Sequence, residues 1–285
     1  MQILCLGPEG TYGHQVAHQI NKRYFGAQGE IVFRESHEEI LVQLERAKDS
    51  DAIGVVAIRN STAGLVMEVV RFWLKPSPLR IMGEVDLPIH HQLLARPGVY
   101  LKEVQSVFSH PQGLAQCDQT LNTLGIGERK SVASTAGAAK MLADRDGKEA
   151  AISSRFCAEL YGLEILAQNI EDVSGNTTRF HIVSNIQNYQ PQREEFRKSK
   201  MVLIMTLKNE AGSLHHALGP IARAGLNMTF LTSIQLNGMD KVAFYVELDA
   251  HPNQEITNSV FHLLKEVGEK LFVLGVFPKG VTLEG

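Results

Sequence analysis

Short apolar segments alternate with amphipathic segments along the first two thirds of the chain. Apolar segments at residues 2–6 and 52–58 are each followed by apolar residues at helical spacing, at 12–22 and 65–74. Ser36, ahead of two glutamates, is typical of a helix N-cap and predicts a further helix. Strands that alternate with helices are typical of a parallel sheet covered on both faces. The pattern therefore predicts an α/β lobe with a doubly wound sheet.

A long strand-like segment at residues 80–95 precedes a second succession of the same kind. Its predicted strands and helices fall at residues 106–108, 112–124, 131–133, 135–142 and 150–152. A strand at residues 179–183 would then return to the first lobe. This order predicts two doubly wound lobes, joined by crossover strands and separated by a cleft, as in periplasmic binding proteins.

The last part of the chain has a different order. After the polar segment 185–198, the apolar periodicities predict the order βαββαβ, which is the ferredoxin-like motif. The predicted strands and helices are residues 201–207, 213–224, 228–236, 241–248, 255–267 and 270–277, with a turn at Asn237-Gly238. We therefore divide the chain into a two-lobed unit at 1–187, a linker at 188–198 and a C-terminal unit at 199–285. Lobe 1 would take residues 1–78 and 176–187, and lobe 2 residues 79–175.

Composition narrows the class of protein. The chain has 285 residues, 44% of them hydrophobic, and a formal net charge of −3, which suits a globular chain of about two domains. We expect no nucleic-acid partner, because Lys and Arg do not cluster, and no membrane span, because no apolar run approaches about 18 residues. The first residues lack the basic flank of a signal peptide. Cys5, Cys117 and Cys157 lie in apolar segments without metal-ligand spacing, which predicts buried, reduced thiols in a cytoplasmic protein.

Small polar residues gather at the predicted strand-to-helix junctions. The segments concerned are residues 7–11, 60–62, 109–112, 134–137 and 175–180. Helix N-termini present unpaired N–H groups and attract anions. Ordinary helix capping would explain several of these residues equally well, with Ser109 at an N-cap and Pro111 in the first turn. Capping does not explain Gln112 and Gln116, one turn apart, so both interpretations stay open.

Several familiar chemistries lack their motifs. The sequence contains no Gly-rich dinucleotide or phosphate loop, no His-Glu-x-x-His and no Cys-x-x-Cys. His90 and His91 are neighbours in a predicted strand, so their side chains should point to opposite faces and cannot chelate one metal. His215 and His216 lie in a predicted helix with no third ligand nearby. The pattern predicts an anion site of hydroxyl, amide and N–H groups that uses no metal or cofactor.

Five segments, in order, resemble motifs of the prephenate dehydratase family. They are Gly-Pro-x-Gly-Thr at residues 7–11, Asn-Ser-Thr at 60–62, Ser-His-Pro-Gln-x-Leu-x-Gln-Cys at 109–117, Ser-Thr-Ala at 134–136, and Tyr-Gly-Leu at 161–163 with Asn-x-Thr-Arg-Phe at 176–180. The C-terminal unit resembles the family's ACT regulatory domain, with residues 209–214 at its Asn-Glu-Pro-Gly-Ala-Leu motif. The likeness covers nearly the whole chain.

The resemblance implies conversion of prephenate to phenylpyruvate, with loss of CO2 and water, in phenylalanine biosynthesis and without a cofactor. It implies that Thr178 donates a hydrogen bond to the departing hydroxyl. The other residues that it places at catalysis are Asn60, Ser109 and Gln116. The residues that we expect to bind substrate are Thr11, Ser61, Thr62, Ser134, Thr135, Arg179 and Phe180. Arg179 would either pair with a substrate carboxylate or tie the two lobes together.

The chain departs from the family pattern at two places that bear on function. Arg59 stands where the family has a glutamate, which would place a guanidinium beside the pocket. The family's Glu-Ser-Arg-Pro effector motif falls on residues 232–235, Thr-Ser-Ile-Gln, and loses both charges. The residues that still match the effector region are Gly212, Ser213, Leu214 and Asn227. We therefore expect phenylalanine to bind weakly or not at all.

Other functions stay open at this point. The protein could dehydrate arogenate, decarboxylate prephenate without losing water, or only bind an oxo acid or amino acid in its cleft. A ferredoxin-like unit with an exposed sheet face and unpaired edges also predicts a homodimer or homotetramer.

Overall fold

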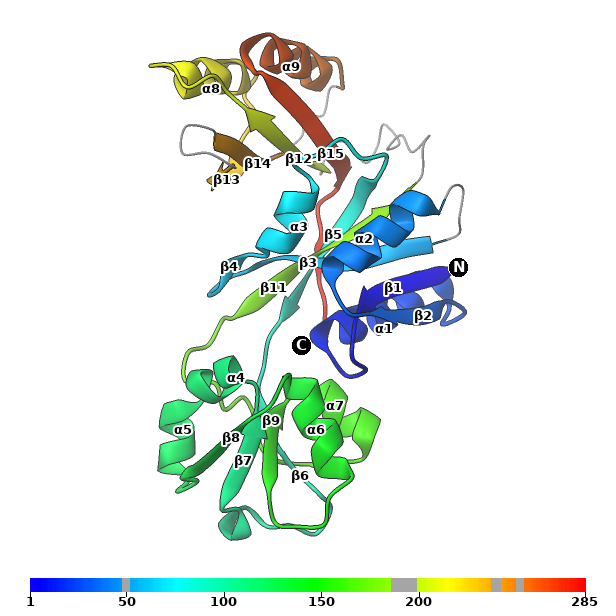
Figure 1. Ribbon diagram of the computed structural model, residues 1–285, viewed down its shortest axis with the longest axis vertical. Coiled ribbons are helices and arrows are strands. Elements are labelled where there is room, and N and C mark those ends of the chain that lie inside the picture. Colours follow the sequence, from blue (N-terminus) through cyan, green and yellow to red (C-terminus); the bar gives the residue numbers. More distant parts are fainter. Residues whose placement is uncertain (48–51, 186–198, 237–241, 250–253) are drawn as a thin grey trace.

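Three sheets follow one another along the long axis of the molecule (Figure 1). The computed structural model describes residues 1–47, 52–185, 199–236, 242–249 and 254–285. The predicted linker at 188–198 and the predicted turn at Asn237-Gly238 lie outside the described residues. Within the described ranges, no helix is both long enough and apolar enough to span a bilayer.

Lobe 1 is a seven-stranded mixed sheet with helices on both faces. The strand order is β16-β5-β11-β3-β1-β2, with β4 beside β3. The strands are β1 (Gln2–Leu6), β2 (Glu30–Arg34), β3 (Ala52–Asn60), β4 (Gly64–Leu65), β5 (Arg80–Pro88), β11 (Thr177–Ser184) and β16 (Val281–Thr282). The helices are α1 (Tyr12–Phe25), α2 (His37–Arg46) and α3 (Met67–Phe72). Ser36 caps α2, as predicted, because its hydroxyl accepts a hydrogen bond from Glu39 N at 3.1 Å.

The central strands of lobe 1 bury side chains on both faces. Along β11, Phe180 and Ile182 pack in a core beneath α1, whereas Val183 packs in a second core with Trp73. Successive side chains of a strand point to opposite faces of the sheet. Thr178 and Arg179, at the start of β11, are therefore directed to opposite sides.

Lobe 2 is a five-stranded sheet of order β10-β6-β9-β7-β8. The strands are β6 (Gln92–Ala95), β7 (Ser106–Ser109), β8 (Glu128–Ser131), β9 (Ala150–Ser153) and β10 (Glu164–Ala167). The helices are α4 (Pro111–Gln116), α5 (Asp118–Thr123), α6 (Thr135–Ala143) and α7 (Arg155–Tyr161), with a 3₁₀ turn at Leu101–Glu103. The single helix predicted at 112–124 is wrong, because Cys117 leaves helical geometry (φ −120°, ψ 14°) and separates α4 from α5.

Two crossing segments join the lobes, and a loop of lobe 1 packs against lobe 2. The segments that leave β5 and enter β11 run side by side, with Ile89 N donating to Asn176 O at 2.8 Å. Gly10 has a φ of +87°, and a Cβ there would lie 2.9 Å from Cys157 Sγ on lobe 2. The loop at residues 7–11 therefore approaches lobe 2 closely and holds it against lobe 1.

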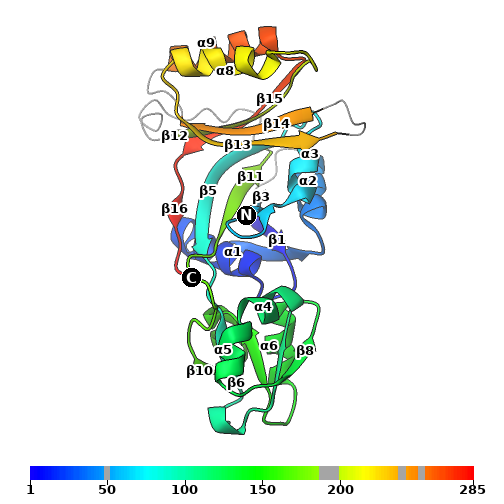
Figure 2. The ribbon, with the colours of Figure 1, turned by 90° about the vertical axis from the view of Figure 1, so that its left-hand side faces the viewer.

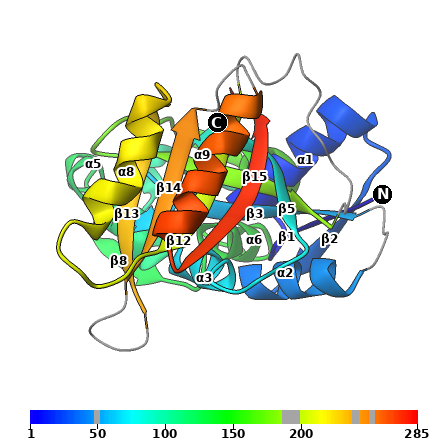
Figure 3. The same cartoon turned by 90° about the horizontal axis from the view of Figure 1, so that it is seen from above.

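The C-terminal domain is a four-stranded sheet of order β13-β14-β12-β15 with two helices on its outer face (Figures 2 and 3). Its elements are β12 (Ser199–Thr206), α8 (Ser213–Arg223), β13 (Met228–Gln235), β14 (Val242–Asp249), α9 (Gln254–Val267) and β15 (Lys270–Pro278). The other face packs on lobe 1, where Ile234, Tyr245 and Phe277 share a core with Ile58 and Trp73. The expectation of an exposed sheet face is therefore wrong, because lobe 1 covers it.

The chain returns to lobe 1 after β15. There β16 pairs with β5 in parallel, with Val281 opposite Val85 and Thr282 opposite Asp86. Residues that the sequence pattern placed in the C-terminal unit thus complete the sheet of lobe 1. The predicted start of lobe 2 at residue 79 is also wrong, because β5 pairs with β11 and lies in the sheet of lobe 1.

The three cysteines are buried and free, as predicted. Burial raises the pKa of Cys5 and of Cys117 to about 12, so both are protonated thiols at neutral pH.

Candidate active site

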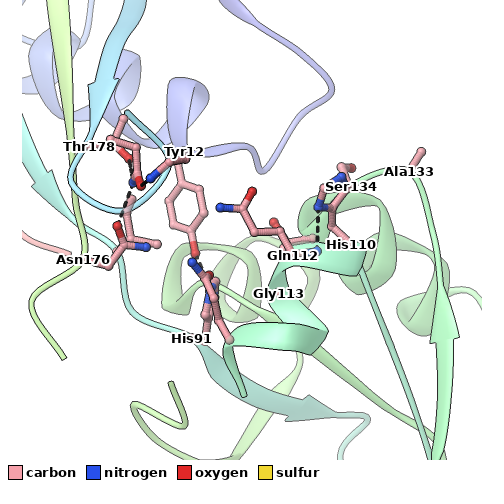
Figure 4. Close-up of a pocket in the computed structure, with 14 residues that line it drawn as sticks. Tyr12, His91, His110, Gln112, Gly113, Ala133, Ser134, Asn176 and Thr178 are labelled. Carbon is pink, nitrogen blue, oxygen red and sulfur yellow. Dashed lines mark hydrogen bonds between the residues drawn. The ribbon is translucent and has the colours of Figure 1, made fainter. Parts of the chain in front are cut away.

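A cavity of about 290 Å³ opens between the two lobes (Figure 4). The residues that line it are Tyr12, Asn60, Ala63, Ile89, His91, His110, Gln112, Gly113, Gln116, Ala133, Ser134, Thr135, Asn176 and Thr178. Figure 4 shows Thr178 and Asn176 on one side, and Gln112 and Ser134 on the opposite side. This lining contains no Asp, Glu, Lys or Arg. The polar groups that these residues offer to a ligand are therefore hydroxyl, amide, imidazole and backbone N–H groups.

The Thr178 hydroxyl is held by the side chain of Asn60. Asn60 Nδ2 donates to Thr178 Oγ1 at 2.9 Å and to Asn176 Oδ1 at 2.7 Å. Strand pairing produces this contact, because Thr178 and Asn60 are direct partners in the antiparallel pair of β11 and β3. A hydroxyl that accepts one hydrogen bond keeps its own proton as a donor. The arrangement leaves Thr178 able to donate into the cavity.

Ser61 and Thr62, expected to bind substrate, are exposed residues that do not line the cavity and instead hold the loop behind Asn60. Thr62 donates to Asn60 Oδ1 from its backbone N at 3.0 Å and from its hydroxyl at 2.7 Å. Ser61 Oγ accepts from Thr177 N at 3.0 Å. These contacts fix the Asn60 amide so that its Nδ2 faces Thr178.

Ser109 is fully buried beneath the lobe 2 wall and does not reach the cavity. Its hydroxyl donates to Ile152 O at 2.9 Å. A Cβ on Gly113 would lie 2.8 Å from Ser109 Oγ, so the glycine lets α4 sit directly on this serine. The prediction of Ser109 as an N-cap is wrong, because His110 caps α4 by accepting from Gln112 N at 3.2 Å.

The rest of the lobe 2 wall contains the predicted residues Gln116, Ser134 and Thr135. Ser134 caps α6, since its Oγ accepts from Gly137 N at 2.9 Å. Gln112 lies beside them, which accounts for the two glutamines that capping left unexplained.

A chain of polar contacts crosses the floor of the cleft from lobe 1 to lobe 2. Tyr12 Oη lies 3.3 Å from His91 Nδ1, and His91 Nε2 lies 2.8 Å from Gln116 Oε1. Burial raises the pKa of Tyr12 well above its usual range, so the phenol stays protonated. His90 does not line the cavity, and its Nδ1 lies 2.7 Å from Glu171 Oε1. The strand predicted across His90 and His91 is wrong, because both residues lie between β5 and β6. Across the described ranges, no cluster of three His, Cys, Asp or Glu side chains could hold a metal ion.

Three further residues expected at the substrate lie elsewhere. Thr11 caps α1, and its hydroxyl donates to Leu6 O at 2.6 Å. Phe180 is a core residue with 3% exposure. Arg179 makes two hydrogen bonds of 2.8 Å to the Asp86 carboxylate on the opposite face of the sheet. Neither expectation for Arg179 holds, because its partners are carboxylates of lobe 1 and of the C-terminal domain.

Arg59 also lies outside the cavity. Its guanidinium carbon is 4.1 Å from the centroid of the Phe230 ring, on β13 of the C-terminal domain. The expectation that Arg59 borders the pocket is therefore wrong. It contributes to domain packing through a cation–π contact.

Tyr12, His91 and Asn176 also line the cavity, although none of them was among the predicted site residues. Tyr12 directly follows the motif at 7–11, and Asn176 opens the motif at 176–180, so their positions were a usable signal. His91 lies between β5 and β6, and not in the strand predicted for it. It is 3% exposed, and yet it lines the cavity.

Two α/β lobes around a neutral polar cleft, with a ferredoxin-like sheet docked on one of them, define the class of this protein. The family described as prephenate dehydratase matches residues 3–188. The chain belongs to the prephenate dehydratase family.

Relatives and solved structures agree with this assignment. A bifunctional chorismate mutase/prephenate dehydratase of Neisseria gonorrhoeae is 31% identical over 99% of this chain and 75% of its own length. A bifunctional N-acyl-homoserine lactone acylase/prephenate dehydratase of Komagataeibacter europaeus is 34% identical over 79% of this chain and 80% of its own length. A prephenate dehydratase of Arthrobacter aurescens, solved in complex with L-Phe, is 25% identical with a TM-score of 0.85, over 98% of this chain and 90% of its own.

Proposed function

We propose that this protein converts prephenate to phenylpyruvate, with release of CO2 and water. The observation that carries the proposal is the Thr178 hydroxyl, which lines the interlobe cavity and accepts a hydrogen bond from Asn60 Nδ2 at 2.9 Å. Prephenate carries two carboxylates and a ring hydroxyl. The site must hold the carboxylates and supply a hydrogen-bond donor to the departing hydroxyl.

The reaction can be written with Thr178 as that donor. The bond between the ring and its carboxylate breaks, its electron pair moves through the ring double bonds, and the ring carbon–oxygen bond breaks. CO2 leaves, and the hydroxyl leaves as hydroxide, which takes a proton from solvent to give water. An ordinary threonine is a very weak acid, so Thr178 serves as a positioned donor that stabilises negative charge on the leaving oxygen. Aromatisation makes the overall step strongly favourable.

A lining without Lys or Arg suits this chemistry. A guanidinium or ammonium group on the ring carboxylate would stabilise the substrate more than a transition state in which that charge disperses. Gln112, Ser134 and the N-terminus of α6 offer neutral donors for the carboxylates from lobe 2. We assign carboxylate binding to this wall and leaving-group contact to Thr178 on the opposite wall.

The reduced, buried thiols fit an activity located in the cytoplasm.

One assay tests the proposal. Purified protein is incubated with prephenate, and ultraviolet absorbance is followed under alkali. Phenylpyruvate supports the proposal, whereas a non-aromatic product would identify a decarboxylase. Saturable binding without turnover would identify a binding protein. Arogenate is tested in parallel, and its preferential conversion would identify an arogenate dehydratase.

The name of the Komagataeibacter relative also includes an acylase activity. A separate assay with an N-acyl-homoserine lactone tests this protein for that activity. Amide hydrolysis by a hydroxyl nucleophile needs an adjacent base. In the described cavity, the partners of Thr178 Oγ1 and Ser134 Oγ are the Asn60 amide and the Gly137 backbone N–H, which cannot accept a proton in this way. We therefore expect no lactone-acyl hydrolysis with Thr178 or Ser134 as nucleophile.

A further inference from the structure

Arg179 is the centre of a partly buried charge cluster on the side of β11 that faces away from the cavity. Besides its two hydrogen bonds to Asp86, its Nη1 lies 3.2 Å from Glu247 Oε2 and 3.6 Å from Glu84 Oε2. Glu84 and Asp86 belong to β5 of lobe 1, whereas Glu247 belongs to β14 of the C-terminal domain. The cluster therefore joins two domains at the residue next to Thr178.

The C-terminal domain contributes both a cation and an anion to this cluster. Lys200 Nζ, on β12, lies 2.9 Å from Glu84 Oε2 and 2.8 Å from Glu247 Oε2. Lys200 is 4% exposed and Glu247 is fully buried. Charges at this depth remain only when they are paired and hydrogen-bonded. The charge of Lys200 is therefore compensated by Glu247 and Glu84, and the charge of Glu247 by Lys200 and Arg179.

The cluster is balanced in charge. Its cations are Arg59, Arg179 and Lys200, and its anions are Glu84, Asp86 and Glu247. Arg59 and Arg179 are direct partners in the pairing of β3 and β11. Their positive charges repel each other, so carboxylates must compensate both. Without Glu247, Arg179 would lose its contact with the C-terminal domain and Lys200 one of its two carboxylates.

The start of β11 is thus held from both faces of the sheet. On the cavity face, Asn60 holds Thr178 at 2.9 Å, and on the opposite face Asp86 and Glu247 hold Arg179. The pairing of β11 with β3 shifts register between Arg179 and Phe180, directly beyond this point. The pairing with β3 is interrupted there, whereas the pairing of β11 with β5 stays regular from Thr177 to Ile182. Side-chain contacts therefore add to the β5 pairing in fixing Thr178 on the β3 side.

We propose that Glu247 is a positioning residue, through which the C-terminal domain fixes Arg179 and hence the Thr178 hydroxyl. The expected effect on kcat rests on the proposed function. The expected effect on the position of Thr178 rests only on the contacts described above. Lys200 supports Glu247 and keeps it in place.

The variants that test this are Glu247→Gln, Lys200→Met and the double variant with both changes. In Glu247→Gln, kcat for prephenate should fall about 10-fold or more, because a shift of about 1 Å at a reacting group has effects of this size. KM should stay within about twofold, because the carboxylate-binding wall belongs to lobe 2. The control is Lys279→Met, which removes an exposed ion pair of the same domain, Lys279 with Asp249 at 2.8 Å, and should leave kcat unchanged.

The double variant separates positioning from stability. It restores charge balance, so the melting temperature should recover relative to Glu247→Gln, whereas kcat should stay low because Arg179 still lacks its anchor. Recovery of both kcat and melting temperature, or a normal kcat in all three variants, would overturn the proposal.

A crystal structure of the double variant gives a readout that does not require turnover. The contact of Thr178 Oγ1 with Asn60 Nδ2 should be lost or lengthened beyond 2.9 Å. An unchanged contact would overturn the role of Glu247, whatever the activity of the protein. Failure of the unaltered protein to produce phenylpyruvate would refute only the proposed function.

Discussion

At the scale of single residues, Thr178 and Thr177 offer a matched comparison, because they are adjacent in β11 and only Thr178 lines the cavity. Thr178→Ala should lower kcat by about 100-fold or more, as expected for loss of a positioned donor. Thr177→Ala should have a much milder effect. Steady-state kinetics with prephenate measure both, and circular dichroism verifies that the fold is intact. Near-normal turnover of Thr178→Ala would refute its role.

Motifs predicted the region of the cavity, but not which of their residues face it. Asn60, Gln116, Ser134, Thr135 and Thr178 all lie at the cavity. A motif shows that a residue belongs to the site region, but it does not show which way the side chain points. Thr178 and Arg179 are successive residues of a strand and cannot both face one cavity.

Burial explains the case of Ser109. It belongs to the same motif as Gln116, but the motif does not show whether a hydroxyl meets substrate or supports the backbone of a neighbour. The close approach of Gly113 to Ser109 decides this, and it depends on the packing of α4 against β7.

At the scale of elements, the docking of β15 on β5 depends on a glycine. A Cβ on Gly275 would lie 2.2 Å from Ile81 O, a backbone atom that cannot move aside easily. Gly275→Ala should therefore destabilise the protein by about 1–3 kcal/mol. Gly83→Ala is the control, since a Cβ there meets nothing within 4 Å, and it should change stability by less than about 0.5 kcal/mol. Chemical denaturation measures both, and equal effects would contradict the steric argument.

Strongly periodic elements were predicted well, and short ones were not. The helix predicted at 135–142 corresponds to α6 (Thr135–Ala143), and the order βαββαβ is present in the C-terminal domain. The two residues of β16 carry no periodicity, and their partner β5 lies almost two hundred positions earlier in the chain. This pairing forms only when the C-terminal domain is docked on lobe 1, and a local sequence pattern does not reveal that docking.

At the scale of the whole molecule, His181 links stability to pH. It is fully buried, neither ring nitrogen has a hydrogen-bond partner among the described residues, and burial lowers its pKa from 6.5 to about 3. The unfolded chain therefore binds one more proton between these values, so this contribution to stability is present above about pH 6.5 and is lost as pH falls.

Replacing His181 with leucine removes that proton difference and two unpaired polar atoms. Between about pH 6 and 4.5, the free energy of unfolding should fall less steeply in His181→Leu, by up to about 1.4 kcal/mol per pH unit. Urea denaturation at several pH values measures the slope. Equal slopes for the two proteins would show that His181 does not titrate as argued.

The oligomeric state remains a prediction. Of the two features on which it was based, the exposed sheet face and the unpaired edges, only the edges remain. Lobe 1 covers one face of the C-terminal sheet, but β13 is an edge strand with Leu231 37% exposed. Unpaired edges favour pairing with a second copy. We expect at least a dimer, and light scattering that gives a monomer at micromolar concentration would contradict this.

Regulation by phenylalanine is the last property to test. The position of the family's effector arginine is Ile234, which is 2% exposed and packs in the core shared with lobe 1. An apolar residue there makes a stable domain contact and offers no hydrogen bond to an amino acid.

The other charge of that motif is replaced by Thr232. Each lost charge-assisted hydrogen bond weakens binding by about 1.5–3 kcal/mol, or roughly 10- to 100-fold in affinity. Gly212 and Asn227 match the family, but Asn227 Nδ2 already donates to Asp249 Oδ2 at 3.1 Å. We therefore expect little or no inhibition when phenylalanine is titrated into the dehydratase assay. The Arthrobacter aurescens protein, solved in complex with L-Phe, is the positive control for binding by calorimetry. Full inhibition of this protein at tens of micromolar, with a matching calorimetric signal, would show that phenylalanine binds without these two charges.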